Sequence, residues 1–86
     1  MILESQLIGI EENTRIQRIV SVILNGVPMR KLAARNDYNV DAMAENLLQN
    51  LSVVMLNNIQ VNEMHLVKDG LKQEIIRRVD VLARAN

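Results

Sequence analysis

The side chains that could do chemistry in this chain are few, and their spacing does not suit catalysis. His65 is the only histidine and there is no cysteine, so disulfides and thiolate chemistry are excluded. A catalytic triad or a histidine-based zinc site needs partners that the sequence does not supply, so we expect His65 at the surface or its boundary. Asp37 and Asp41 are spaced as paired carboxylates on a helix would be, but stabilisation of a helix start explains them better. With no glycine-rich phosphate loop and no calcium loop, the sequence predicts a protein that is not an enzyme and uses no metal or cofactor.

Basic residues form two clusters, and both are typical of solvated helix faces. The first cluster is Arg30, Lys31 and Arg35, and the second is Lys72, Arg77, Arg78 and Arg84. Glu74 precedes Arg77 by three residues and Arg78 by four, which is ordinary pairing along one helix.

Apolar spacing predicts the elements that position these groups. Residues recurring at i, i+3, i+4 and i+7 indicate helices over 14–25, 28–36, 40–57 and 63–84, with a short helix over 3–10 before them. Gly26 is a stop signal, and Asn13 or Thr14, Asn39 and Asn62 are suitable N-caps. Gly70 marks either a kink or a break in the last helix. No useful segment alternates with period two, so we expect an all-α, compact bundle of four to five helices.

The segment from Gly26 to Leu48 has the spacing of a helix-turn-helix. Leu32-Ala33 would open the pattern, residues 37–39 stand at its turn, Ala42-Met43 follow, and Leu47 closes it. A small residue is needed where the two helices cross, and the turn needs a residue that tolerates positive φ. Residues 28–48 therefore resemble the helix-turn-helix superfamily, with Asp37 in place of the usual glycine.

That resemblance implies that residues 40–57 would be the DNA-reading helix. The contacts it implies are made by Arg30, Lys31, Arg35, Asn39 and Asn46. Asp41 and Glu45 are expected on the same outward face, and residues 40–58 carry a net charge of −2, which repels phosphates. We therefore rank DNA binding below protein binding.

Composition fits a single small domain, residues 1–86. Half of the residues are apolar (49%), but the only aromatic is Tyr38, so aliphatic side chains and methionines must form the core. Ten basic residues balance ten acidic ones, which gives no general attraction to nucleic acid or to anionic lipid. The N-terminus lacks the basic start of a signal peptide and no apolar run could span a bilayer. We expect a cytoplasmic protein without membrane insertion.

Four apolar residues are left over once each helix has been given one inner face: Val53, Leu56, Ile76 and Val81. An apolar surplus of this kind predicts a covered surface and a homo-oligomer. We therefore expect a small protein-binding regulator, adaptor or inhibitor of the type that bacteria and phages encode as short chains. The alternatives are a helix-turn-helix transcription regulator and a structural subunit of a larger assembly.

Overall fold

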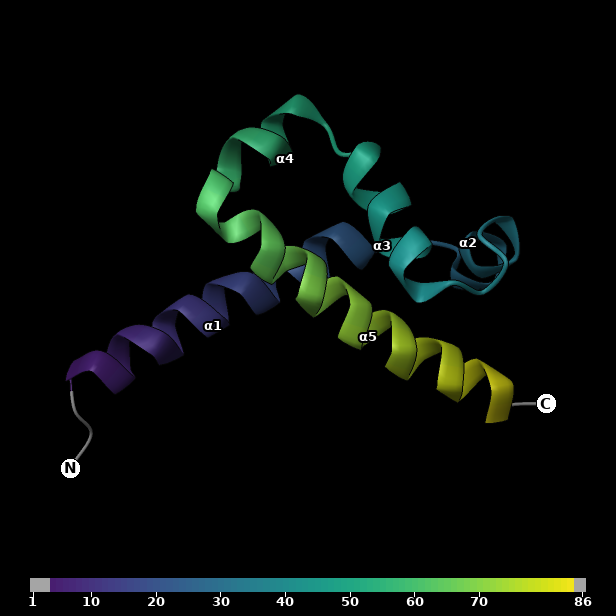
Figure 1. Ribbon diagram of the computed structural model, residues 1–86, viewed down its shortest axis with the longest axis horizontal. Helices are drawn as coiled ribbons and strands as arrows, with labels where there is room; N and C mark the ends of the chain where they lie inside the picture. Colours follow the sequence, from purple (N-terminus) through teal and green to yellow (C-terminus); the bar gives the residue numbers. More distant parts are fainter. Residues whose placement is uncertain (1–3, 85–86) are drawn as a thin grey trace.

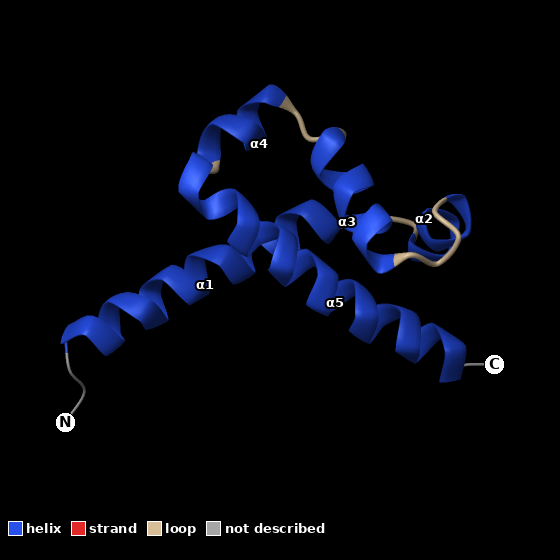
Figure 2. Cartoon of the chain, viewed as in Figure 1, coloured by secondary structure: helices blue, strands red, loops and turns tan. Residues whose placement is uncertain are grey.

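A central helix organises the fold, which is all-α over the part of the chain that the structure describes (Figures 1 and 2). The structure is a computed structural model that describes residues 4–84, with side chains from residue 13 onward except that of residue 83. The elements are α1 (Glu4–Leu24), α2 (Met29–Arg35), α3 (Val40–Gln49), α4 (Val53–Asn58), the 3₁₀ turn η1 (Val61–Glu63) and α5 (Met64–Arg84). Helix α5 packs against α1, α2 and α3, so the expected all-α bundle is confirmed.

Helix α1 is longer than expected. The predicted helices over 3–10 and 14–25 are one continuous helix, and residue 3 lies outside the described residues. Asn13 and Thr14 therefore lie inside α1 and do not cap its start, because no proline separates the two apolar stretches. The stop at Gly26 is confirmed, since this residue has a φ of 75°, which glycine adopts without steric cost. The N-terminal half of α1 extends away from the other helices (Figure 1).

The predicted helix over 40–57 is wrong in one respect, because it breaks into α3 and α4. The Nδ2 group of Asn50 donates to the carbonyl of Asn46 (2.7 Å) at the end of α3. The Oγ atom of Ser52 then accepts a hydrogen bond from the backbone N–H of Met55 (3.2 Å) and caps α4. Such side chain–backbone bonds compete with a continuous helix. The apolar spacing of a continuous helix over 40–57 would place Val54 on the same inner face as Leu47, but the break turns Val54 out to solvent.

The core is aliphatic and lies between α5 and the helices around it. Its largest fully buried side chains are Leu24, Met43, Leu71, Ile75, Val20 and Val67. In the last helix the apolar residues Val67, Leu71 and Ile75 recur every four positions, which predicts one inner face. All three are buried, so this prediction is confirmed. Leu47, which both the apolar stripe and the helix-turn-helix pattern place inside, is only half-buried. Met43 and Ala44 are the buried residues of α3.

Gly70 neither kinks nor breaks α5, and its role is to let α1 approach. A Cβ atom at this position would lie 2.9 Å from Cγ2 of Val20 and 3.7 Å from Cγ2 of Ile16. The first distance is too short for an ordinary contact, so the two helices meet where α5 has no side chain. The absence of a side chain at Gly70 therefore sets the spacing of α1 and α5.

We predict that Gly70→Ala lowers the free energy of unfolding. Alanine gains about 1 kcal/mol of helix propensity. Crowding against the stiff, β-branched Val20 costs roughly 1–3 kcal/mol, so the net loss should reach up to about 2 kcal/mol. Urea denaturation measures this change. In a Val20→Ala background the same substitution should stabilise the chain, and stabilisation already in the wild-type background would contradict the close approach.

Candidate functional site

The turn between α2 and α3 has the backbone shape that the helix-turn-helix pattern needs. Asp37 and Tyr38 have φ values of 54° and 59°, so the position expected to tolerate positive φ does adopt it. The N–H of Tyr38 donates to the carbonyl of Ala33 (2.8 Å), which closes the end of α2. The side-chain oxygen of Asn39 accepts from the N–H of Ala42 (3.0 Å), so Asn39 caps α3 as predicted.

The acidic residues of α3 are bound to α5. The Nζ atom of Lys68 lies 2.6 Å from Glu45 Oε1 and 3.3 Å from Asp41 Oδ1, and Nζ of Lys72 lies 3.4 Å from the same Asp41 oxygen. Hydrogen bonds from Lys68 and Lys72 lower the pKa of Asp41, and the bond to Glu45 raises the pKa of Lys68. Both side chains are about half exposed, at 57% for Asp41 and 46% for Glu45, so they lie at the surface as expected, but on the flank of α3 that meets α5.

The residues proposed for DNA contact are divided between a basic helix, α2, and an acidic one, α3. Arg30, Lys31 and Arg35 are exposed on α2, and none forms an ion pair within residues 4–84. On α3, Asn39 uses its oxygen as a cap and Asn46 is half-buried. The sequence has no lysine or arginine between Arg35 and Lys68, so α3 and α4 present no cation to a phosphate.

The apolar residues Val53 and Leu56 lie on a surface that is larger than the sequence indicated. No residue of α4 is buried, and Val53, Val54 and Leu56 are 72%, 71% and 41% exposed. Val61 in η1 is 95% exposed. Residues 51–62 contain no charged side chain, and we call their exposed part the α4–η1 surface. The break after Gln49 exposes Val54, and the uncharged run was the sequence signal that could have revealed this surface.

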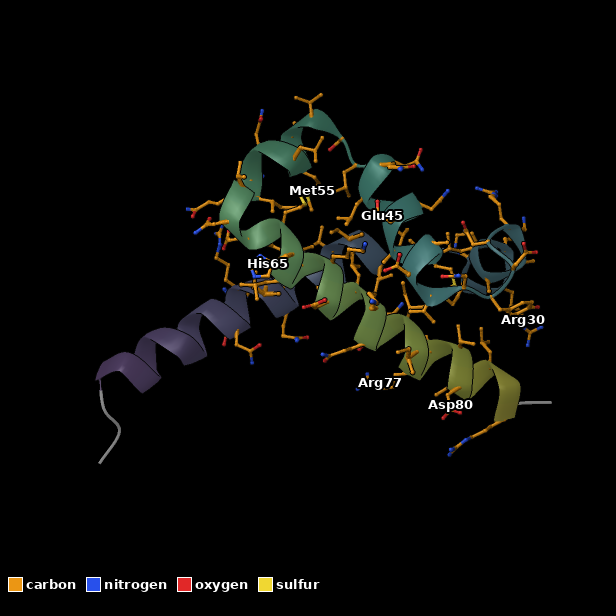
Figure 3. All side chains as sticks on the ribbon, viewed as in Figure 1. Arg30, Glu45, Met55, His65, Arg77 and Asp80 are labelled. Atoms are coloured by element: carbon orange, nitrogen blue, oxygen red, sulfur yellow. The ribbon has the colours of Figure 1, made fainter. Side chains whose placement is uncertain are left out.

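A hollow of about 490 Å³ adjoins the α4–η1 surface. Its lining residues come from α3, η1 and the start of α5: Glu45, Leu48, Gln49, Val61, Met64, His65 and Lys68. Figure 3 shows the labelled Glu45, Met55 and His65 on the elements that surround this region. His65 is exposed, as expected. Among the described residues no group of three acidic, histidine or cysteine side chains could hold a metal ion.

Ile76 and Val81 do not extend the α4–η1 surface. They are 55% and 60% exposed, but they lie in the C-terminal half of α5, far from α4 in Figure 1. Their spacing of five residues also places them about 140° apart around the helix axis. The four leftover residues therefore belong to separate surfaces, and they do not form one interface.

Val81 belongs to a second surface that the sequence did not reveal. With Met29 of α2 and Leu82 it lines a groove of about 390 Å³, whose other lining residues are Glu74, Arg77 and Arg78. We call it the basic groove. The predicted pairing of Glu74 with Arg77 and Arg78 is confirmed, each at 3.3 Å. Only the packing of α2 on α5, which no local pattern reports, brings Met29 beside Val81.

A partly buried ion pair joins α1 to η1, directly before α5, and no local pattern in the sequence predicts it. Nε of Arg15 lies 2.9 Å from Glu63 Oε2, and its Nη2 donates to Glu63 Oε1 (3.2 Å) and to the carbonyl of Asn58 (2.8 Å). Glu63 also accepts from the N–H of Gln60 (3.0 Å) in a capping box, a role expected of Asn62. Arg15 and Glu63 are 48 positions apart, so no local spacing rule could have paired them.

None of the described helices is long and apolar enough to cross a bilayer.

We predict that Glu63 makes stability depend on acid pH. The bonds from Arg15 and from the backbone of Gln60 lower the pKa of Glu63 in the folded chain. The stability it contributes is therefore present above the pKa of an unfolded glutamate and is lost as the pH falls through the lower folded value. Circular-dichroism melting at pH 6 and pH 3 measures this loss. Glu63→Gln should melt lower at pH 6 and lose less on acidification, and an unchanged acid dependence would contradict the assignment.

Comparison with known proteins finds no relative of this chain. No family model, no curated protein and no solved structure matches the chain. The resemblance of residues 28–48 to the helix-turn-helix superfamily rests on the chain's own residues, and the function has to be argued from its surfaces.

Proposed function

We propose that this chain is a non-enzymatic protein-binding regulator, adaptor or inhibitor that pairs with a second copy of itself through the α4–η1 surface. The observation that carries the proposal is α4 itself. No residue of this helix is buried, and its first two residues, Val53 and Val54, are 72% and 71% exposed. Exposed apolar patches of this kind are uncommon on monomers and favour association.

The chemistry of the α4–η1 surface fits a second copy. In a twofold pair the same patch meets itself, so each side chain contacts residues of that same patch on the other copy. A charged patch would then repel its copy, whereas residues 51–62 carry no charge. The chain as a whole is also neutral, so two copies approach without general repulsion.

The shape of this region supports the same partner. Exposed valines project from α4 and η1, and the hollow beside them has Leu48 and Met64 in its lining. In a twofold pair the valines of each copy can fill the hollow of the other. The hollow and the exposed valines of each copy would then be covered by the other copy.

Sedimentation equilibrium at micromolar concentration tests the self-association. The wild-type chain should form a dimer that changes little with salt, because the contact is uncharged. Val53→Asp should give a monomer that keeps its circular-dichroism spectrum, since Val53 is 72% exposed and is not part of the core.

Val22→Asp is the matched control for that experiment. Val22 is 59% exposed on α1, away from the α4–η1 surface, so this variant should remain a dimer. A wild-type chain that stays monomeric would refute the proposal. Assemblies that keep growing with concentration would favour the structural-subunit alternative.

We predict that binding to mixed duplex DNA at physiological salt is weak or absent. Asp41 and Glu45 are paired with lysines and so repel phosphates less than expected, but α3 still offers no cation. Fluorescence anisotropy with a labelled duplex measures the affinity. Gln49→Lys, at an exposed position of α3, should raise it. Nanomolar binding of the wild-type chain to a selected duplex, lost on Arg30→Ala or Asn46→Ala, would make DNA reading the function.

Adding positive charge to α3 by Asp41→Lys with Glu45→Lys would not give a clear measure of DNA affinity. Both carboxylates bind Lys68, so their replacement by lysine would place like charges together between α3 and α5. We expect loss of stability from that double variant, which would obscure any gain in DNA affinity.

A further inference from the structure

The basic groove lies at the end of the molecule where positive charge accumulates. Residues 28–39 and 74–84, which include α2 and the C-terminal half of α5, carry six basic and three acidic side chains, a net charge of +3. The chain is neutral, so the remainder carries −3. Figure 3 shows the labelled Arg30, Arg77 and Asp80 together at this end.

The cations around the groove keep unused hydrogen-bonding capacity. Arg77 and Arg78 share one oxygen, Oε1 of Glu74, through a single donor atom each. Because a guanidinium has five N–H donors, most of their donors remain available to a carboxylate. Arg30 and Lys31, which directly follow the lining residue Met29, form no ion pair among the described residues.

The lining of the groove is apolar apart from Arg77, Arg78 and the Glu74 carboxylate with which both arginines pair. Met29, Val81 and Leu82 supply hydrophobic surface, and Val81 is 60% exposed. An apolar lining offers a phosphate neither charge nor hydrogen bonds. The neighbouring α3 also has no lysine or arginine that could contact further phosphates of a DNA strand. An amphipathic helix satisfies both features, since its apolar stripe fills the groove while its acidic flanks meet the arginines.

We propose that the basic groove binds an acidic amphipathic helix of a partner protein. The inference rests on the proposed function in that the chain acts by binding proteins. It uses a different surface from the α4–η1 pair, so a dimer could present two such grooves to its targets.

Fluorescence anisotropy with a labelled synthetic helix tests the groove. The probe is a peptide about four turns long, with leucines at i, i+3, i+4 and i+7 and glutamates on both flanks. The matched probe has glutamine in place of glutamate. The full-length chain should bind the glutamate peptide at least about tenfold more tightly, and added salt should reduce the difference.

Two groove variants and one control locate the site. Arg77→Glu, at an exposed arginine that lines the groove, and separately Val81→Asn, should each weaken binding of the glutamate peptide by about tenfold or more. Arg18→Glu removes an exposed cation of α1 that does not line the groove, and it should leave the affinity nearly unchanged. Unchanged circular-dichroism spectra show that the variants are folded.

Several results would overturn the assignment. Equal affinity for the two peptides, or equal loss with Arg18→Glu, would mean that the attraction is not local to the groove. Binding to a duplex that is tighter than peptide binding and depends on Arg30 would assign the cations to nucleic acid. Absence of peptide binding by a chain that still dimerises in the centrifuge would refute the groove alone and leave the α4–η1 proposal standing.

Discussion

The close approach of α1 and α5 at Gly70 is the constraint on which the rest of the structure depends. Val20 lies where a side chain at position 70 would lie, so any larger residue would push the two longest helices apart. Near this crossing, Arg15 of α1 reaches Glu63 and the carbonyl of Asn58. That contact fixes the end of α4 and the start of α5 relative to α1. The position of the α4–η1 surface therefore follows from the crossing.

Electrostatics divides the described part of the molecule into three regions with different uses. Asp41, Glu45 and Glu63 are engaged in ion pairs between elements, where they hold α3 and α1 to the α5 region. Residues 51–62 contain no charge at all, which suits contact with an identical surface. The cations of α2 form no ion pair with any residue that the structure describes, so they remain available to an outside ligand. A neutral chain can thus carry one uncharged and one basic surface.

Local rules predicted the helices well, because apolar periodicity, Gly26 and the Asn39 cap act over a few residues. They failed at Asn50 and Ser52, where side-chain bonds to the backbone outcompete an apolar pattern that otherwise continues. They also failed for contacts between distant residues. The sequence indicated Asp41 and Glu45 as surface residues, but nothing in it reveals that this flank of α3 meets Lys68. It could indicate Val53 and Leu56 as surplus apolar residues, but it could not show that Ile76 and Val81 lie on different surfaces.

Pairing of the α4–η1 surface with its own copy can be followed residue by residue by NMR of the unmodified chain. Backbone amide correlation spectra recorded over a dilution series report which residues sense association. Self-association through this surface predicts concentration-dependent amide chemical shifts concentrated in residues 48–64, with α2 and residues 74–82 unaffected. Spectra that do not change with concentration, or that change mainly around α2 and the end of α5, would contradict it.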